Sequence, residues 1–304
     1  MNVLFLNHKI ENCGVYQYGK RVFDILAVDE EINYIYKEVD TYQEYHDLQK
    51  DVSYIIYNYH CATMPWLTHE NIQKTVKNIG IPHESSAALF DIVCNIDPDQ
   101  PETATSVSLP RPLFETIESL PMRSEVKEFI EYTDADTPIF GSFGFGFEFK
   151  GFDKIIKYVN EQYDTAIIKF VIPVAHYDPD VNRISAINSI CHNVNIKPTI
   201  KLLISNSFFT TNEILQFLRS NTMNIFLYDK LEGRSISSTI DYALSVKRPL
   251  AISDSCMFKH IYSDEICLYK NTIRHCLQSE YLHPFLTKYS NKNMRAVFKK
   301  ILPL

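Results

Sequence analysis

The sequence predicts an α/β protein made of two facing Rossmann-like domains with mainly parallel sheets. The chain has 304 residues, which suggests two domains at roughly 150 residues each. Short β-rich runs alternate with helical patterns along almost the whole chain, as in βαβ units, whose strands are parallel. Proline-rich loops at 98–101 and 110–112 interrupt this alternation, and it then starts again. We therefore expect a second sheet after these loops.

The first series of strands and helices precedes the proline-rich loops. The apolar run at 3–6 is typical of a buried strand, and a helix at 15–27 places Val22, Ile25 and Leu26 on one face. The remaining elements expected in this series are strands at 32–36, 54–57, 79–81, 91–96 and 106–109, with helical patterns at 42–48 and 70–76.

The second series follows a helix expected at 124–132. Its strands are expected at 138–142, 166–172, 199–204, 225–228 and 250–252, and its helices at 151–162, 180–193, 211–220 and 237–246. We predict an N-terminal domain over 1–125, a C-terminal domain over 126–285 and a last helix within 286–304. Because such sheets bind ligands beyond the carboxyl ends of their strands, the site is expected in the cleft between the domains.

The composition argues against several classes of protein. The 30 Lys and Arg residues against 37 Asp and Glu residues give a net charge of −7. A protein that binds the nucleic-acid backbone requires a basic surface instead. No apolar run approaches the roughly 18–20 residues that span a bilayer, and the first one is too short for a signal peptide. The 7 cysteines are scattered and never form C-x-x-C, which favours reduced thiols. We expect a soluble, cytoplasmic protein that binds no nucleic acid.

Glycine is concentrated in one loop of the second series. Half of the 8 glycines lie in GSFGFGFEFKG, between an expected strand and the helix at 151–162. Glycine lets the backbone turn tightly and approach a ligand, as at Gly144, and a helix N-terminus suits phosphate. Lys150 adds a full positive charge beside the turn. The spacing matches neither the dinucleotide fingerprint nor the P-loop, so the loop predicts another kind of phosphate site.

A second polar loop, EGRSISS, occupies the same kind of position after a later strand. Arg234 is suited to binding phosphate through two parallel hydrogen bonds, and Glu232 to accepting hydrogen bonds from hydroxyl groups. Ser237 belongs to a group of serines that favour a helix start, where N–H groups attract anions. Asp241 adds another acceptor if it lies on the exposed face of that helix. The combination predicts a second half of the same binding site.

At these two segments the chain resembles the GT-B glycosyltransferases, in particular the large retaining, nucleotide-sugar-dependent family with a Glu-containing C-terminal motif. GSFGFGFEFKGFDKII looks like its Gly-rich loop, Lys-Gly and helix, and EGRSISSTIDYALSVKRPLAIS like its Glu-Gly loop and following helix. The resemblance implies that Lys150 and Arg234 hold the donor diphosphate, that Glu232 contacts the donor sugar, and that Asp241 contacts the ribose. It implies sugar transfer from a nucleotide-diphosphate donor substrate to a hydroxyl, with no cofactor and no metal.

Two features depart from that family's pattern. Eight residues separate Glu232 from Asp241 where the family has seven, and counting back from Pro249 puts Tyr242 in the second acid's place. Both residues therefore stay open as the ribose contact. The arginine that often starts the first loop is replaced by phenylalanine.

The resemblance assigns the N-terminal domain to a hydroxyl-bearing acceptor, which would be a glycan, a lipid-linked molecule or a protein. Gly14 follows the first strand, where the family often has a glycine-containing loop near the diphosphate. His60 and His83 each follow a strand, so both are candidates to orient or deprotonate the acceptor hydroxyl. The last helix crosses back to the N-terminal domain in many such proteins, and its basic and apolar residues also fit a peripheral membrane contact.

Two other functions compete with this one. A metal-dependent GT-A transferase would hold a divalent cation with an Asp-x-Asp pair, and three such triplets occur: Asp97-Pro-Asp99, Asp134-Ala-Asp136 and Asp178-Pro-Asp180. The altered acid spacing instead favours a nucleotide-sugar- or glycan-binding protein that keeps the GT-B fold without turnover.

Overall fold

The computed structural model describes residues 1–48, 52–118, 120–175, 177–178 and 180–302. Pro179, which belongs to one Asp-x-Asp triplet, and residues 303–304 of the predicted last segment lie outside this set. The chain forms two compact units: unit 1 is Met1–Leu113 with Lys288–Leu304, and unit 2 is Phe114–Thr287. Each unit holds its own sheet, as the sequence predicts.

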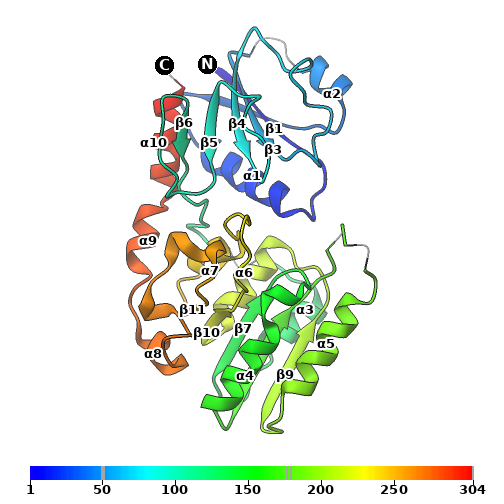
Figure 1. Cartoon of the computed structure of the whole chain (residues 1–304), viewed down its shortest axis with the longest axis vertical. Helices are drawn as coiled ribbons and strands as arrows, with labels where there is room; N and C mark the ends of the chain where they lie inside the picture. The colour runs from blue at the N-terminus through cyan, green and yellow to red at the C-terminus, as the bar shows by residue number, and fades with distance from the viewer. Residues whose placement is uncertain (49–51, 119, 176, 179, 303–304) are drawn as a thin grey trace. The chain divides into compact units, whose positions relative to one another are not determined.

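Unit 1 is built on a six-stranded sheet in the order β2-β1-β3-β4-β5-β6, and every pair of neighbours is parallel (Figure 1). Its strands are β1 (Asn2–Asn7), β2 (Asn33–Glu38), β3 (Tyr54–Tyr59), β4 (Lys77–Pro82), β5 (Ile92–Asn95) and β6 (Ser106–Ser108), and its helices are α1 (Gly14–Leu26), α2 (Tyr42–Asp47) and α10 (Asn291–Ile301). Side chains of β1 alternate between two apolar clusters, one with Val3 and Phe5 and one with Leu4 and Leu6. The sheet is therefore buried on both faces, as parallel sheets usually are.

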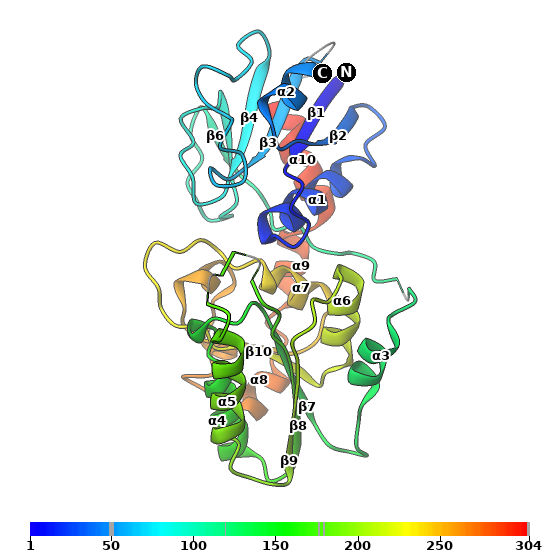
Figure 2. The same cartoon turned by 90° about the vertical axis from the view of Figure 1, so that its right-hand side faces the viewer.

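The last helix packs into unit 1. Met294 and Phe298 of α10 share an apolar cluster with Val22 and Leu26 of α1, and Figure 2 shows the two helices next to each other. The Lys299 Nζ atom lies 3.1 Å from a carboxylate oxygen of Asp29. The apolar face of α10 is thus covered by its own chain.

The segment 70–76, which the sequence predicts to be helical, consists of turns and bends before β4. Its backbone groups bind side chains instead of forming a helical ladder. The Gln73 N–H donates to the Tyr45 hydroxyl at 2.9 Å, and the Asn78 side-chain amide donates to the Gln73 carbonyl at 2.7 Å. The prediction of a helix here is wrong because these tertiary bonds replace the local ones.

Unit 2 is built on a five-stranded parallel sheet in the order β11-β10-β7-β8-β9. Its strands are β7 (Ile139–Phe143), β8 (Ala166–Val171), β9 (Ile200–Ser205), β10 (Met223–Phe226) and β11 (Leu250–Ile252). Its helices are α3 (Ser124–Glu131), α4 (Phe152–Gln162), α5 (Arg183–Val194), α6 (Thr211–Ser220), α7 (Thr239–Ser245), α8 (Ile273–Gln278) and α9 (His283–Lys288), with short 3-10 helices at Glu148–Lys150, Cys256–Ile261 and Asp264–Ile266. Figure 2 shows α4 and α5 on one face of the sheet and α3 and α6 on the other.

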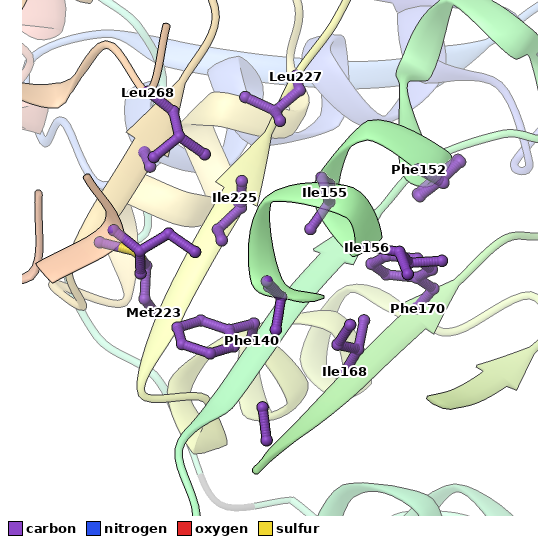
Figure 3. Packing of buried hydrophobic residues seen from close by; sticks show 14 of the residues in the cluster. Phe140, Phe152, Ile155, Ile156, Ile168, Phe170, Met223, Ile225, Leu227 and Leu268 are labelled. Carbon is purple, nitrogen blue, oxygen red and sulfur yellow. The ribbon is translucent and has the colours of Figure 1, made fainter. Parts of the chain in front are cut away.

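The core of unit 2 lies between α4 and the sheet. Figure 3 shows Phe140, Ile168 and Phe170 from β7 and β8 against Ile156 of α4. The ring of Phe170 lies 5.1 Å from that of Phe152. Each such side chain contributes about 1.5–3 kcal/mol by leaving water, so this layer holds the loops at the strand ends in fixed positions.

Candidate functional site

The two loops selected from the sequence meet at the carboxyl ends of β7 and β10. The Asp229 N–H donates to the Phe149 carbonyl at 2.8 Å, and Lys154 forms an ion pair with Asp229. Gly151 has φ +64°, and a Cβ there would lie 2.1 Å from the Leu227 carbonyl oxygen. Only glycine permits this close approach, so the end of the first loop is fixed against β10.

Lys150 is buried at this junction. Its Nζ atom donates to the Tyr228 hydroxyl at 2.7 Å and lies 3.9 Å from the centre of that ring. A Cβ added to Gly144, whose φ is +150°, would lie 3.4 Å from both Lys150 Nζ and the Tyr228 hydroxyl. Within the described part of the chain, no carboxylate forms an ion pair with Lys150. A buried ammonium without a carboxylate partner is suited to an anionic ligand.

Lys169 is a second buried lysine of unit 2, but its surroundings differ. Its ammonium group donates to the Ile130 carbonyl at 2.7 Å, at the end of α3. Burial lowers the pKa of Lys169 to about 8. This lysine links β8 to α3, and its role is structural.

Arg234 approaches the Lys150 site from the second loop. Its guanidinium carbon lies 5.9 Å from the centre of the Phe149 ring, and Lys150 Nζ lies 5.5 Å from the same ring. The structure thus places both of the predicted diphosphate cations against one side chain. Glu232 is exposed on this loop, next to the exposed turn at Gly233.

Neither candidate for the ribose contact reaches the surface. Asp241 is fully buried in α7, and Tyr242 is buried with its ring 5.1 Å from Phe114 and 5.6 Å from Phe143. The prediction required Asp241 to lie on an exposed face, and α7 has none there, since its residues from Ile240 to Ser245 are all buried. The condition of an exposed face is therefore not met, and a ribose contact from Asp241 or Tyr242 stays a prediction.

Three hydroxyl groups extend the Lys150 site toward the second loop. The Tyr228 hydroxyl lies 3.0 Å from Thr239 Oγ1, which lies 2.8 Å from Ser237 Oγ. Ser237 is buried, and its backbone N–H donates to the Met257 carbonyl at 3.1 Å. Ser237, a predicted site residue, is therefore connected to Lys150 through two residues that the sequence did not single out for a role.

In unit 1, the carboxyl ends of β1, β3 and β4 hold a buried polar network. The Asn58 amide donates to Asn7 Oδ1 at 2.9 Å and to the Val15 carbonyl at 2.8 Å. The Asn58 Oδ1 atom therefore faces His83 Nε2, at 2.8 Å. Because an amide oxygen only accepts, Nε2 carries the proton and Nδ1 of His83 carries the lone pair.

His83 is neutral at physiological pH. Burial, and to a lesser degree the neighbouring Arg111 guanidinium, lower the pKa of His83 to about 3. A base this weak holds almost no proton near neutral pH, so His83 is suited to orienting a hydroxyl through Nδ1 and unsuited to deprotonating it.

His60 and Gly14 lie near the same strand ends. The half-buried His60 accepts the Ala62 N–H on Nδ1 at 3.1 Å, so its neutral ring presents Nε2–H as a donor. Gly14 is exposed at the first position of α1, after Cys13, whose side chain does not cap the helix. Both histidines are thus hydrogen-bonding groups in unit 1, one an acceptor and the other a donor.

The residues that sequence reasoning missed are Tyr228, Thr239, Asn58 and Asn7. Tyr228 lies two residues after the end of β10, and Asn7 and Asn58 are among the last two residues of β1 and β3. Their position at the carboxyl end of a buried parallel strand was the available signal.

The Asp-x-Asp triplets form ion pairs with basic side chains. Asp99 lies 2.8 Å from Lys288, Asp134 lies 2.9 Å from Lys201, and Asp178 lies 2.5 Å from Arg183. Within the described ranges, no group of three or more His, Cys, Asp or Glu side chains is arranged to hold a metal ion.

No described helix is both long enough and apolar enough to cross a membrane.

Comparison with solved structures identifies the class of the fold. HepE from Anabaena, solved with UDP and glucose, is 9% identical and has a TM-score of 0.66 over 99% of both chains. A glycosyltransferase from Rickettsia africae and the sucrose-phosphate synthase of Thermosynechococcus elongatus are each 10% identical, with TM-scores of 0.68 over 99% of this chain and 98% of theirs. No protein-family model and no curated protein sequence matches the chain. The fold is that of the GT-B glycosyltransferases, which confirms the predicted fold class.

Proposed function

We propose that the protein is a glycosyltransferase that moves a sugar from a nucleotide-diphosphate donor to a hydroxyl acceptor. One observation carries this proposal: the ammonium group of Lys150 is buried beside Gly144, and its hydrogen-bond partner is a neutral tyrosine. Keeping a buried cation without a carboxylate is costly unless the site serves an anion. The diphosphate of a nucleotide sugar supplies such an anion in a protein with this fold.

Lys150 and Arg234 would act mainly on the leaving group. When the bond between sugar and diphosphate breaks, negative charge grows on the diphosphate oxygens. The buried Lys150 would stabilise that charge more strongly than it would in water, and the exposed Arg234 beside the same Phe149 ring would add a second cation. We infer that these side chains supply the charge that a metal ion provides in other transferases.

Glu232 and the two histidines would act on the sugar and the acceptor. Glu232 is exposed on the second loop, where its carboxylate is free to accept hydrogen bonds from donor-sugar hydroxyls. His83 Nδ1 would accept a hydrogen bond from a ligand hydroxyl, while the neutral His60 would donate one. We propose an acceptor that bears a free hydroxyl on a glycan, a lipid-linked molecule or a protein.

A donor panel tests this function directly. Wild-type protein is incubated with UDP-, GDP- and ADP-sugars, and release of the nucleoside diphosphate is measured; UDP-glucose comes first because a HepE structure contains it. At least one donor should be consumed. Lys150→Ala and Glu232→Ala should each lower the rate at least 30-fold, because each removes a buried or charged contact worth roughly 2 kcal/mol.

Lys157→Ala is the matched control. Lys157 lies on the adjacent helix α4, where it is exposed and paired with Asp153 at 2.7 Å, so its removal should leave the rate within about twofold. A rate that is equal in the Lys150 and Lys157 variants would contradict the proposed role of Lys150.

A second candidate function is favoured by the burial of Asp241 and Tyr242. If no side chain takes the second acid's role, the protein could bind a nucleotide sugar without transferring it. Tight binding of a donor that depends on Lys150, together with no turnover of any donor, would identify this function.

A further inference from the structure

The hydrogen bonds around Tyr228 have a favoured direction. Lys150 Nζ has only protons to give, so the Tyr228 oxygen accepts at 2.7 Å. Tyr228 is buried, and its one proton finds an acceptor in Thr239 Oγ1 at 3.0 Å. The Thr239 proton then points to Ser237 Oγ at 2.8 Å. Either direction leaves one proton without a partner among the described residues: this one leaves the proton of Ser237, which is 6% exposed, and the reverse leaves the proton of Tyr228, which is 1% exposed and lies against the ammonium group. The first direction is favoured because each hydroxyl then accepts one hydrogen bond, and both Tyr228 and Thr239 pass the polarisation on.

The proton of Ser237 is the free end of this chain. Ser237 Oγ already accepts from Thr239, and in the part of the chain that the structure describes its own proton has no acceptor. Because the chain starts at an ammonium group, each hydroxyl is polarised by the one before it and becomes a better donor. Ser237 is 6% exposed, so bulk water has little access to it.

We propose that Ser237 is a directed hydrogen-bond donor for an oxygen of the donor diphosphate, and that Thr239 and Tyr228 are positioning residues that transmit the charge of Lys150 to it. This inference rests on the proposed function, since it names a second contact for the same diphosphate. Lys150 would then act on the anion twice, once through its own N–H groups and once through the Ser237 hydroxyl. Anionic oxygens are the acceptors that a polarised hydroxyl binds best.

The test measures the affinity of the full-length protein for UDP and for inorganic pyrophosphate by titration calorimetry. Ser237→Ala should raise Kd about tenfold for both probes, because it removes one charge-assisted hydrogen bond. Thr239→Val keeps the size of the side chain but removes the hydroxyl that links Tyr228 to Ser237, so it should raise Kd about fivefold. Thr239→Ser, which keeps the hydroxyl, should restore the wild-type Kd.

The double variant Ser237→Ala with Thr239→Val separates a chain from two independent contacts. If Thr239 acts through Ser237, the double variant should bind as Ser237→Ala alone does, and the effects should not add. Ser238→Ala is the matched control, because Ser238 is the neighbouring residue and its side chain does not cap α7. Its Kd should stay within about twofold of wild type.

The outcomes distinguish this inference from the proposed function. Any of three results would overturn the hydrogen-bond chain: unchanged affinity in Ser237→Ala, additive effects in the double variant, or equal losses of affinity in Thr239→Val and Thr239→Ser. The proposed function would still stand in each case if Lys150→Ala weakens binding. A wild-type protein that binds neither UDP nor pyrophosphate would contradict the proposed function and this inference together.

Discussion

Lys150 and His83 are both buried ionisable residues, but their surroundings differ in kind. Lys150 lies over an aromatic ring and donates to a hydroxyl, whereas His83 donates to an amide oxygen and is buried near Arg111. A buried cation fits an anionic ligand, and a neutral imidazole fits a hydroxyl. Each residue therefore supplies its own unit with a different kind of hydrogen-bonding group.

At this scale the sequence offers candidate residues but does not predict their partners. Lys150 and Arg234 stand out because each occupies a glycine-containing loop after a strand. Tyr228 does not stand out, because its contact with Lys150 spans 78 positions and depends on β10 lying beside β7. Burial of Asp241 was equally hidden, since it follows from packing on all sides of α7.

We predict that His83 makes the protein less stable as the pH falls below 6.5. The folded state holds the pKa of His83 near 3, below its unfolded value of 6.5, so the unfolded chain binds more protons between these values. This contribution to stability is complete above pH 6.5 and is lost on the way to pH 3. His83→Gln removes the titrating group and keeps a donor for Asn58.

Urea unfolding of both proteins at pH 6.5 and pH 5 measures the effect. From pH 6.5 to pH 5, wild type should lose about 1–2 kcal/mol more than His83→Gln does. An equal pH dependence in the two proteins would show that His83 is not held neutral by its surroundings.

Among the elements, α6 shows where local sequence is sufficient. The helix is found at the predicted residues and starts with a capping box in which Thr210 accepts the Glu213 N–H and Glu213 accepts the Thr210 N–H. The same carboxylate also binds Arg123, before α3, at 2.8 and 2.9 Å. That second bond spans 90 positions and was not visible in the sequence. Segment 70–76 shows the opposite case, since tertiary hydrogen bonds prevent a helix there.

We predict that Glu213→Gln weakens the contact between α6 and Arg123 before α3, and lowers the free energy of unfolding by about 2 kcal/mol at pH 7. The hydrogen bonds from Arg123 lower the pKa of Glu213 to about 2 in the folded state, against 4.5 when unfolded. Its contribution is therefore complete above pH 4.5 and is lost as the pH falls toward 2. The variant should accordingly equal wild type in stability near pH 2.

Far-UV circular dichroism during urea unfolding at pH 7 and pH 3 follows this change. Glu131→Gln is the control, because Glu131 is exposed on α3 and its contact with Lys127 is 3.8 Å long, so it should cost less than about 0.5 kcal/mol. A similar loss in both variants would contradict a special role for Glu213.

For the whole molecule, the sequence predicts two parallel sheets because strands and helices alternate twice. It does not predict the order of the strands, which depends on how each crossover packs. The order places β1 beside β3 and β10 beside β7, and these neighbours bring Asn7 to Asn58 and Lys150 to Tyr228. Each of these two contacts is thus a product of the topology of its own unit.

We predict that α10 stabilises unit 1. Phe298 is fully buried in the cluster that α10 shares with α1, so Phe298→Ala should cost about 3–4 kcal/mol. Trp66 is the only tryptophan and lies in unit 1, which makes its fluorescence a reporter of that unit alone. The unfolding midpoint seen by Trp66 should fall to lower urea concentration.

Phe170→Ala provides the comparison, because Phe170 is equally buried but belongs to the core of unit 2. It should lower the midpoint seen by circular dichroism more than the midpoint seen by Trp66. An unchanged Trp66 midpoint in Phe298→Ala would mean that α10 adds nothing to unit 1.

The central claim is that the buried ammonium of Lys150 binds the diphosphate of a nucleotide sugar. Titration calorimetry of UDP-glucose and UDP against wild type, Lys150→Ala and Lys157→Ala tests it most directly. We expect Lys150→Ala to raise Kd by about 30- to 100-fold for both ligands and Lys157→Ala to change it less than twofold. Equal affinities in the wild type and the Lys150 variant would contradict the claim.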